Sequence, residues 1–217
     1  RRVAPPALAA AEAANAIADR YGATHQHALG RLALAQALHA CGRADDAWRV
    51  LADARRFGDL MQGEITGYQA DLCAASFALA AGDETGCAGA LERAFRVGAG
   101  QDYLNHHHFL PAEMARLCAF ALEHAIVPEF ARRLIAVRRL KPPHIDAPLW
   151  PWPVQVHTLG RFSLVVGGQP VSATDGLQQK KPLDILRVLI ALGGRDIRIG
   201  DAISAIWPTT ATAGNEP

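Results

Sequence analysis

Two stretches of this chain, "AQALHACGRADDAWRVLADARRFG" at 35–58 and "ASFALAAGDETGCAGALERAFRVG" at 75–98, align at an offset of 40 residues. The same residue types recur at Gly42 and Gly82, Leu51 and Leu91, Ala54 and Ala94, and Gly58 and Gly98. Ala47 corresponds to Cys87, which is also a small residue. Where two helices cross closely, only small side chains fit between the backbones, and a period near 40 with a glycine turn indicates stacked helix pairs. The sequence therefore predicts an α-solenoid, in which Ala47, Ala54, Cys87 and Ala94 are buried.

Residues 1–140 are predicted to form this helical repeat region. The order of small and large residues from Ala35 to Ala54 resembles a tetratricopeptide repeat, although Ala78 stands in the second copy where a large residue is usual. An Ala-rich helical bundle without true repeats is the alternative. Glycines at 22, 42, 58, 82 and 98 are expected near helix ends. The apolar periodicity predicts helices at roughly 7–21, 25–41, 44–57, 62–81, 84–97, 111–124 and 128–139.

The segment "KPPHIDAPLWPWPV" at 141–154 changes the character of the sequence, because its five prolines cannot continue a helix. Residues 141–153 are predicted to be a linker between two domains. Trp150 and Trp152 are expected to pack against a neighbouring element, since amphipathic aromatic side chains seldom stay free in water.

Residues 154–217 are predicted to form a small α+β domain. A strand at 154–159 precedes a hairpin whose turn is Gly167–Gly168, followed by a helix from 180, a short strand at 195–199 and a two-turn helix ending at Pro208. The predicted core of this domain comprises Phe162, Leu164, Leu186, Leu189, Ile190, Ile203 and Trp207.

The stretches "LGRFSLVVGGQPV", "KKPLDILRVLIALGGRDI" and "AISAIWP" together resemble the DNA-binding domain of SARP-like bacterial transcriptional activators, which is a winged helix of the OmpR type. The region before the linker is similar to the end of the repeat array in regulators of the maltose-activator type. The resemblance implies a signal-sensing or oligomerising array joined to a DNA-binding domain. In that family a recognition helix follows the Trp-Pro pair, whereas "TTATAGNEP" has neither an apolar period nor a basic residue. We therefore expect an incomplete winged helix, either from a fragmentary chain or from a shifted frame.

The net charge of +1 gives no global attraction to nucleic acid, so contact with DNA has to come from a local patch. Lys180, Lys181 and Arg187 are the candidate contacts to the DNA backbone. A second basic run comprises Arg132, Arg133, Arg138, Arg139 and Lys141, for which a solvated helix face is the simpler interpretation.

Catalytic and metal-binding motifs, including the P-loop, the G-x-S-x-G elbow and H-E-x-x-H, do not occur in the sequence. Consecutive residues on a helix diverge by about 100°, so His106, His107 and His108 are not expected to converge on one metal. One or two of them are expected to pack at a helix joint as neutral rings with an N–H on a backbone carbonyl. Cys41, Cys73, Cys87 and Cys118 are expected to be small buried core residues, with a disulfide or zinc site as the alternative.

We thus predict a cytoplasmic, non-enzymatic fragment of a bacterial transcriptional regulator without a cofactor, whose winged helix lacks its recognition helix. Its expected partners are DNA, bound weakly or not at all, and a protein or second copy bound through the repeats; no membrane span is expected, because no apolar stretch is long enough. The alternative function is a repeat-type protein-interaction module without DNA-binding activity.

Overall fold

The computed structural model describes residues 5–61, 63–171 and 180–207, apart from a few side chains at the edges of these ranges. By its contacts the chain divides into two compact units, Arg1–Pro151 (unit 1) and Trp152–Pro217 (unit 2). Among the described residues, unit 1 is helical, and unit 2 holds a small antiparallel sheet and two helices. The prediction of a mainly α chain with a small β-containing part is confirmed.

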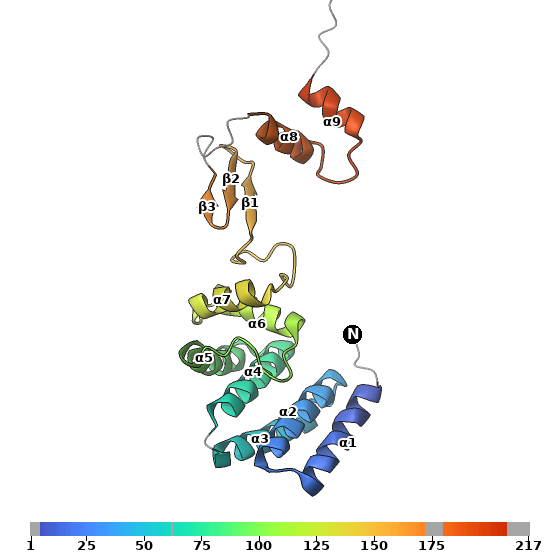
Figure 1. The fold of residues 1–217 in the computed structure, drawn as a ribbon, viewed down its shortest axis with the longest axis vertical. Helices are drawn as coiled ribbons and strands as arrows, with labels where there is room; N and C mark the ends of the chain where they lie inside the picture. Colours follow the sequence, from blue (N-terminus) through green and yellow to red (C-terminus); the bar gives the residue numbers. More distant parts are fainter. Residues whose placement is uncertain (1–4, 62, 172–179, 208–217) are drawn as a thin grey trace, which may run out of the picture. The chain divides into compact units, whose positions relative to one another are not determined.

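Within unit 1 the helices follow one another in chain order, with α2 packed on α3, α4 on α5 and α6 on α7 (Figure 1). The helices are α1 (Pro5–Tyr21), α2 (Thr24–Ala40), α3 (Ala44–Met61), α4 (Glu64–Ala81), α5 (Glu84–Gln101), α6 (Pro111–Glu123) and α7 (Pro128–Arg138). Their bounds lie within about four residues of those predicted from the apolar periodicity.

The 40-residue offset seen in the sequence recurs in the helix bounds. Helix α4 begins 40 residues after α2, α5 begins 40 residues after α3, and α1 ends 40 residues before α3. The small residues predicted to lie at tight crossings are fully inaccessible to solvent: Ala47, Ala54, Cys87 and Ala94. The prediction that these four residues are buried is therefore confirmed.

Each of the three helix pairs reverses through the same kind of turn. A residue in the left-handed region ends the first helix, with φ of 82° at Gly42, 75° at Gly82 and 53° at Ala125. A backbone hydrogen bond then runs back five residues, from Arg43 to Leu38, from Asp83 to Ala78, and from Ile126 to Ala121. This pattern is the Schellman motif. The third pair, α6 and α7, is thus built like the first two, although it has an alanine where they have glycine.

Two glycines expected near helix ends lie inside helices instead. A Cβ at Gly98 would stand 2.6 Å from Cζ of Phe130, and one at Gly58 would stand 2.8 Å from Cγ2 of Thr66. Helices α3 and α5 continue past these positions to Met61 and Gln101. Close approach to a neighbouring helix, and not a helix end, therefore accounts for both glycines.

Polar links also join successive helices at equivalent places. Arg55 on α3 donates to Asp71 on α4 at 2.5 Å, and Arg93 on α5 bonds the same carboxylate at 2.9 Å. Forty residues earlier, Arg31 on α2 donates to the side chains of Asn15 and Asp19 on α1. At the 40-residue offset, the acceptor Asp71 on α4 corresponds to the donor Arg31 on α2. The direction of the link is therefore reversed between the two junctions.

The segment predicted to be a linker lies mostly within unit 1, which extends to Pro151, and it contributes one buried aromatic side chain. Trp150 is buried in unit 1, as are Leu140 and Ala147, whereas Trp152 is half-buried. The expectation that Trp150 packs against its surroundings is confirmed.

Unit 2 begins with a sheet in the order β1-β2-β3, formed by Val154–His157, Ser163–Val166 and Gln169–Pro170. Val154 faces Val166 across the first antiparallel pair, and Val166 faces Gln169 across the second. Gly167 and Gly168 close the hairpin with φ of 58° and 79°, which confirms the predicted turn. Helices α8 (Lys180–Ala191) and α9 (Ile199–Ile206) follow.

The predicted strand at 195–199 is wrong. Residues 195–198 have no regular structure, Asp196 takes a left-handed φ of 52°, and Ile199 already begins α9. A strand needs a neighbour to pair with, and a left-handed residue interrupts an extended backbone.

The core predicted for unit 2 is only partly formed. Ile203 and Trp207 are 50% and 51% exposed, which contradicts their assignment as core residues, and the other predicted members are half-buried. The expectation that part of this apolar face is uncovered is confirmed. Residues 208–217, where the recognition helix was judged absent, lie outside the described residues.

Candidate functional site

Of the three candidate DNA contacts, the side chains of Lys180 and Lys181 lie outside the described residues. Arg187 lies on α8, where its guanidinium bonds Asp184 at 2.8 Å and stands 4.6 Å from the ring centre of Phe162. About half of its side chain is exposed. A phosphate would therefore have to compete with Asp184 for this guanidinium.

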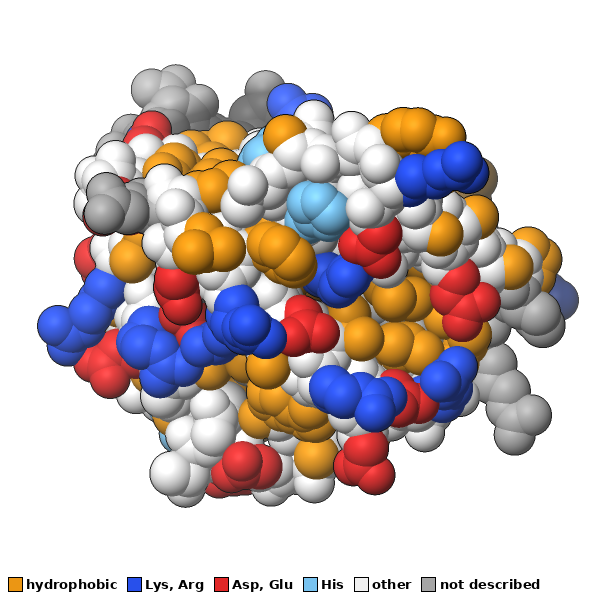
Figure 2. Space-filling view, turned by 90° about the horizontal axis from the view of Figure 1, so that it is seen from below, with side chains coloured by type: hydrophobic (Ala, Val, Ile, Leu, Met, Phe, Trp, Pro, Cys, Tyr) orange, Lys and Arg blue, Asp and Glu red, His pale blue; other side chains and the backbone are white. Residues whose placement is uncertain are grey.

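The basic run on α7 is similarly engaged. Arg132 bonds Glu129 at 2.6 Å, Arg133 bonds Asp102 at 2.9 Å, and Arg138 stacks on Phe109. On another face of unit 1, the one seen from below in Figure 2, acidic and basic side chains are likewise interspersed. This arrangement of the run fits a solvated helix face better than a phosphate-binding patch.

A cavity of about 280 Å³ in unit 1 brings together side chains from helices distant in the sequence. Its walls come from α2, α4 and α6, which are the first helices of the three pairs, and from the segment between α5 and α6. Its polar lining residues are Gln36, His39, Gln69, Cys73, Ser76, His106, His108, Glu113 and Arg116. Its apolar lining residues are Leu32, Ala40, Leu72, Phe77, Ala80, Leu110, Met114 and Leu117.

One side of the cavity carries an ion pair. Oε2 of Glu113 accepts a hydrogen bond from the hydroxyl of Ser76 at 3.0 Å, and Nη1 of Arg116 lies 3.3 Å from both carboxylate oxygens. The side chains of Glu113 and Arg116 are 40% and 43% exposed. Both charged groups are therefore held in place but remain open to another molecule.

His39 lies flat against Phe77, with ring centres 4.1 Å apart. Burial lowers the pKa of His39, while the carboxylate of Glu113 partly offsets that effect. The imidazole is consequently neutral at pH 7 and offers the cavity one donor and one acceptor.

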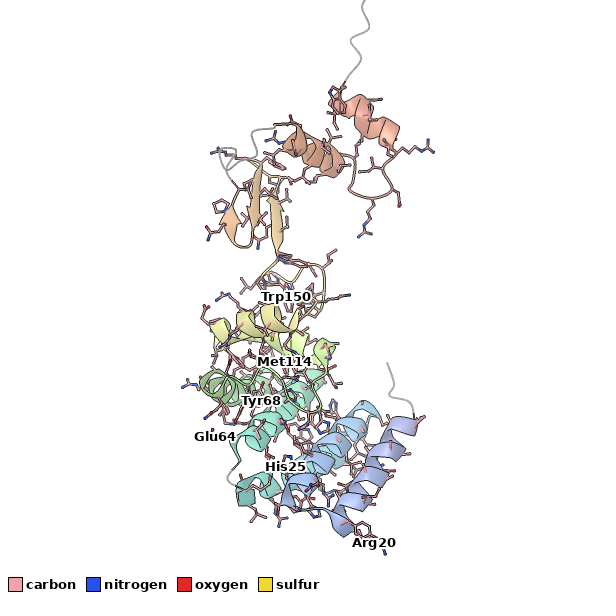
Figure 3. All side chains as sticks on the ribbon, in the orientation of Figure 1. Arg20, His25, Glu64, Tyr68, Met114 and Trp150 are labelled. Carbon is pink, nitrogen blue, oxygen red and sulfur yellow. The ribbon has the colours of Figure 1, made fainter. Side chains whose placement is uncertain are left out.

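The histidine cluster lies in the irregular segment 103–110 and not on a helix, which corrects the expected geometry. The ring of His106 meets Tyr68 edge-on and also contacts Phe109. Tyr68 holds the segment by donating its hydroxyl to the carbonyl of Tyr103 at 3.0 Å, and it lies inside unit 1 as Met114 does (Figure 3). His106 is therefore fixed by packing between aromatic rings.

The expected hydrogen bond from a ring N–H to a backbone carbonyl is not formed by His106. Neither ring nitrogen of His106, nor Nε2 of His108, has a hydrogen-bond partner among the described residues, although all three atoms are buried. A backbone hydrogen bond to Leu29 does serve His108. Burial, the neighbouring histidines and Arg138 lower the pKa of His106 to about 4, so its ring is neutral, as expected.

The cysteines are divided between core and surface. Cys73, Cys87 and Cys118 are buried as predicted, whereas Cys41 is exposed at the end of α2, which contradicts the prediction. Gln36 contacts Sγ of Cys73 at 3.4 Å on the cavity wall, and burial raises the pKa of this thiol to about 12. Cys73 therefore stays protonated and contributes to the cavity as a small apolar group.

This cavity was not among the predicted sites, but the 40-residue offset contained a signal for it. Three pairs of equivalent positions line its wall, namely Leu32 and Leu72, Gln36 and Ser76, and Ala40 and Ala80. The spacing of four residues places each set on one face of its helix. The contributions from α6 and from 106–110 have no such signal, because the third pair departs from the 40-residue offset.

Within the described ranges, no group of three or more His, Cys, Asp or Glu side chains is placed to hold a metal ion. None of the helices in those ranges has the length and apolar character needed to cross a lipid bilayer. No family model, curated protein or solved structure matches this chain.

Proposed function

We propose that this chain is part of a bacterial transcriptional regulator, with tetratricopeptide-like repeats that sense a signal and a C-terminal unit that belongs to a winged-helix DNA-binding domain. Support for the second part comes from the order of elements in unit 2. Three antiparallel strands lead into two consecutive amphipathic helices, which matches the predicted order except for the short strand expected between the two helices. The sequence motifs of that resemblance fall on β2, α8 and α9.

The repeats have support of their own. Helix bounds recur at 40 residues, the small residues at the crossings are buried, and the first helices of the pairs share one cavity. A shared cavity lined by both apolar and polar side chains is a common form of small-molecule site. This cavity is the main observation in support of the proposed sensing role.

The DNA-binding role is tested by titrating the chain into a fluorescent random-sequence duplex at several salt concentrations. Residues 150–217 carry six Lys or Arg against five Asp or Glu, so we expect weak binding without sequence preference. With two or three phosphate contacts, the logarithm of affinity falls with the logarithm of salt at a slope of about −2 to −3.

The triple variant Lys180→Gln, Lys181→Gln, Arg187→Gln is expected to abolish this binding. The matched control removes three charges from α7, with Arg132→Gln, Arg133→Gln and Arg138→Gln, and is expected to leave it unchanged. Equal losses in both variants, or no binding at low salt, would overturn the role given to unit 2.

A second function, a protein-interaction module without DNA binding, is favoured by one observation. Arg187 already bonds Asp184, which leaves fewer unpaired cations on α8. A failed DNA titration together with a specific complex formed by unit 1 would support this alternative.

A further inference from the structure

We infer that the cavity between α2, α4 and α6 binds a single free α-amino acid with an apolar side chain. The inference rests on the sensing role proposed above and names the class of signal. Three features of the cavity support it: the net charge of the lining, the position of the charged groups and the apolar interior.

The lining as a whole has no net charge. Glu113 and Arg116 are its ionised members, and His39, His106 and His108 stay neutral because burial disfavours their protonated forms. A ligand with a net charge would leave one of its charges unmatched against a largely apolar lining, which is costly. The ligand is therefore expected to be neutral overall.

The two ionised groups lie side by side, one turn apart on α6. A carboxylate next to a guanidinium matches the ammonium and carboxylate that an α-amino acid carries on one carbon. The carboxylate of Glu113 and the hydroxyl of Ser76, already 3.0 Å apart, can both accept from an ammonium, which has three donors. The guanidinium of Arg116 keeps further N–H donors for the ligand carboxylate.

The contact between Glu113 and Arg116 is weak enough for a ligand to replace it. Nη1 of Arg116 lies 3.3 Å from both oxygens of Glu113, which is longer than the roughly 2.7–2.9 Å typical of a strong charge-assisted bond. A zwitterion can thus replace the loose Glu113–Arg116 contact with two closer ones, from its ammonium to Glu113 and from Arg116 to its carboxylate. The charges stay balanced.

The remaining walls select the side chain of the ligand. Leu32, Leu72, Phe77, Met114 and Leu117 surround the space, and the neutral ring of His39 lies against Phe77. A charged side chain would find no ionised partner among these residues. The volume of about 280 Å³ lies just below the roughly 300–1,000 Å³ of typical small-molecule sites, which favours one amino acid over a longer peptide.

Isothermal titration calorimetry on the whole chain tests the inference with L-leucine, L-methionine and L-phenylalanine. L-aspartate and L-lysine test side-chain selection, while 3-methylbutylamine and 4-methylpentanoate each carry only one of the two charged groups. We expect saturable binding of at least one apolar amino acid, and at least about tenfold weaker binding of L-aspartate, L-lysine, 3-methylbutylamine and 4-methylpentanoate.

Variants on α6 provide the second arm. Glu113→Gln and Arg116→Gln are each expected to weaken binding about tenfold or more. Glu129→Gln and Arg132→Gln remove one partner from the same kind of pair on α7, which lies outside the cavity lining, and are expected to have no effect. Ala80→Leu narrows the cavity from an exposed position, so it is expected to reduce binding without unfolding the chain.

Three results would overturn the inference: no binding of any apolar amino acid at about 10 mM, equal binding of the amine or the acid alone, or equal loss in the α6 and α7 variants. Thermal melting of each variant separates loss of the site from loss of the fold. The DNA titration is scored separately, so amino-acid binding without DNA binding would overturn only the role of unit 2.

Discussion

The two units of the chain differ in how far their apolar side chains are buried. In unit 1 leucine and alanine side chains from every helix pair are buried, whereas no side chain described in residues 152–207 is buried. Helices α8 and α9 have 12 and eight residues, a length at which an isolated helix is marginal in water. Unit 1 therefore supports its own helices, and unit 2 depends on further burial. An uncovered apolar face of this kind promotes association.

The largest expected effect tests whether stability resides in unit 1. Leu91→Ala removes a side chain that is fully buried and is expected to cost about 2–5 kcal/mol of unfolding free energy. Ile203→Ala in unit 2 alters a side chain that is half exposed and is expected to cost less than about 1 kcal/mol. Urea unfolding followed by circular dichroism measures both. Equal costs would contradict the contrast between the units.

The next effect sharpens the comparison within unit 1, at one repeat position. Ala54 on α3 is fully buried, whereas Ala14, the equivalent residue on α1, is exposed. Ala54→Leu is expected to destabilise the fold by about 1–3 kcal/mol through overpacking. Ala14→Leu is expected to change stability by no more than about 0.5 kcal/mol. An unchanged melting temperature for Ala54→Leu would show that the repeat assignment is wrong.

A third test uses the unpartnered ring of His106. Its pKa is about 4 in the folded protein against 6.5 in the unfolded chain, so the unfolded chain binds more protons between these values. Stability is therefore lost as pH falls below 6.5, and this residue accounts for roughly 2 kcal/mol between pH 7.5 and pH 5.

His106→Phe keeps a ring between Tyr68 and Phe109 and removes both nitrogens, so it is expected to reduce that loss. The control His144→Gln alters an exposed histidine and is expected to leave the pH profile unchanged. A profile that stays the same in His106→Phe would assign the pH dependence to other groups.

The smallest effect concerns the turns of the helix pairs. Gly82→Ala places a side chain at a φ of 75° and is expected to cost about 1 kcal/mol. Ala125→Gly relieves the same strain in the third pair, so it is expected to stabilise the protein, by less than about 1 kcal/mol, because glycine loses more entropy on folding. Thermal melts of the two variants that shift in the same direction would show that the turns are not equivalent.

The sequence predicted the helices of unit 1 well, because apolar periodicity and local turn residues determine them. It failed where a residue acts through a distant neighbour. Gly58 and Gly98 were placed near helix ends, but each lies inside a helix where another side chain approaches. The strand at 195–199 was inferred from composition alone, without a neighbour to pair with.

The candidate site was foreseen less well than the fold. The 40-residue offset relates Gln36 to Ser76, but only the packing of α6 brings Glu113 to the hydroxyl of Ser76. The third pair was not recognised as a repeat, because Ala125 stands at the turn position where the other two pairs have glycine. The three predicted DNA contacts remain predictions, and Arg187 is the one whose side-chain surroundings are known.

The reversed polarity of the two helix junctions fixes the order in which the pairs can be joined. Arg55 faces Asp71 across one junction, and the residue equivalent to Asp71 in the preceding pair is Arg31. If residues 24–63 were duplicated in tandem, Arg55 of the first copy would face Arg31 of the second, and two guanidinium groups would meet without a carboxylate. The two pairs share one backbone plan, but the surface of α3 matches the charge on α4 and not the charge on α2. Lengthening the array by copying this pair therefore requires a change of charge at the new junction.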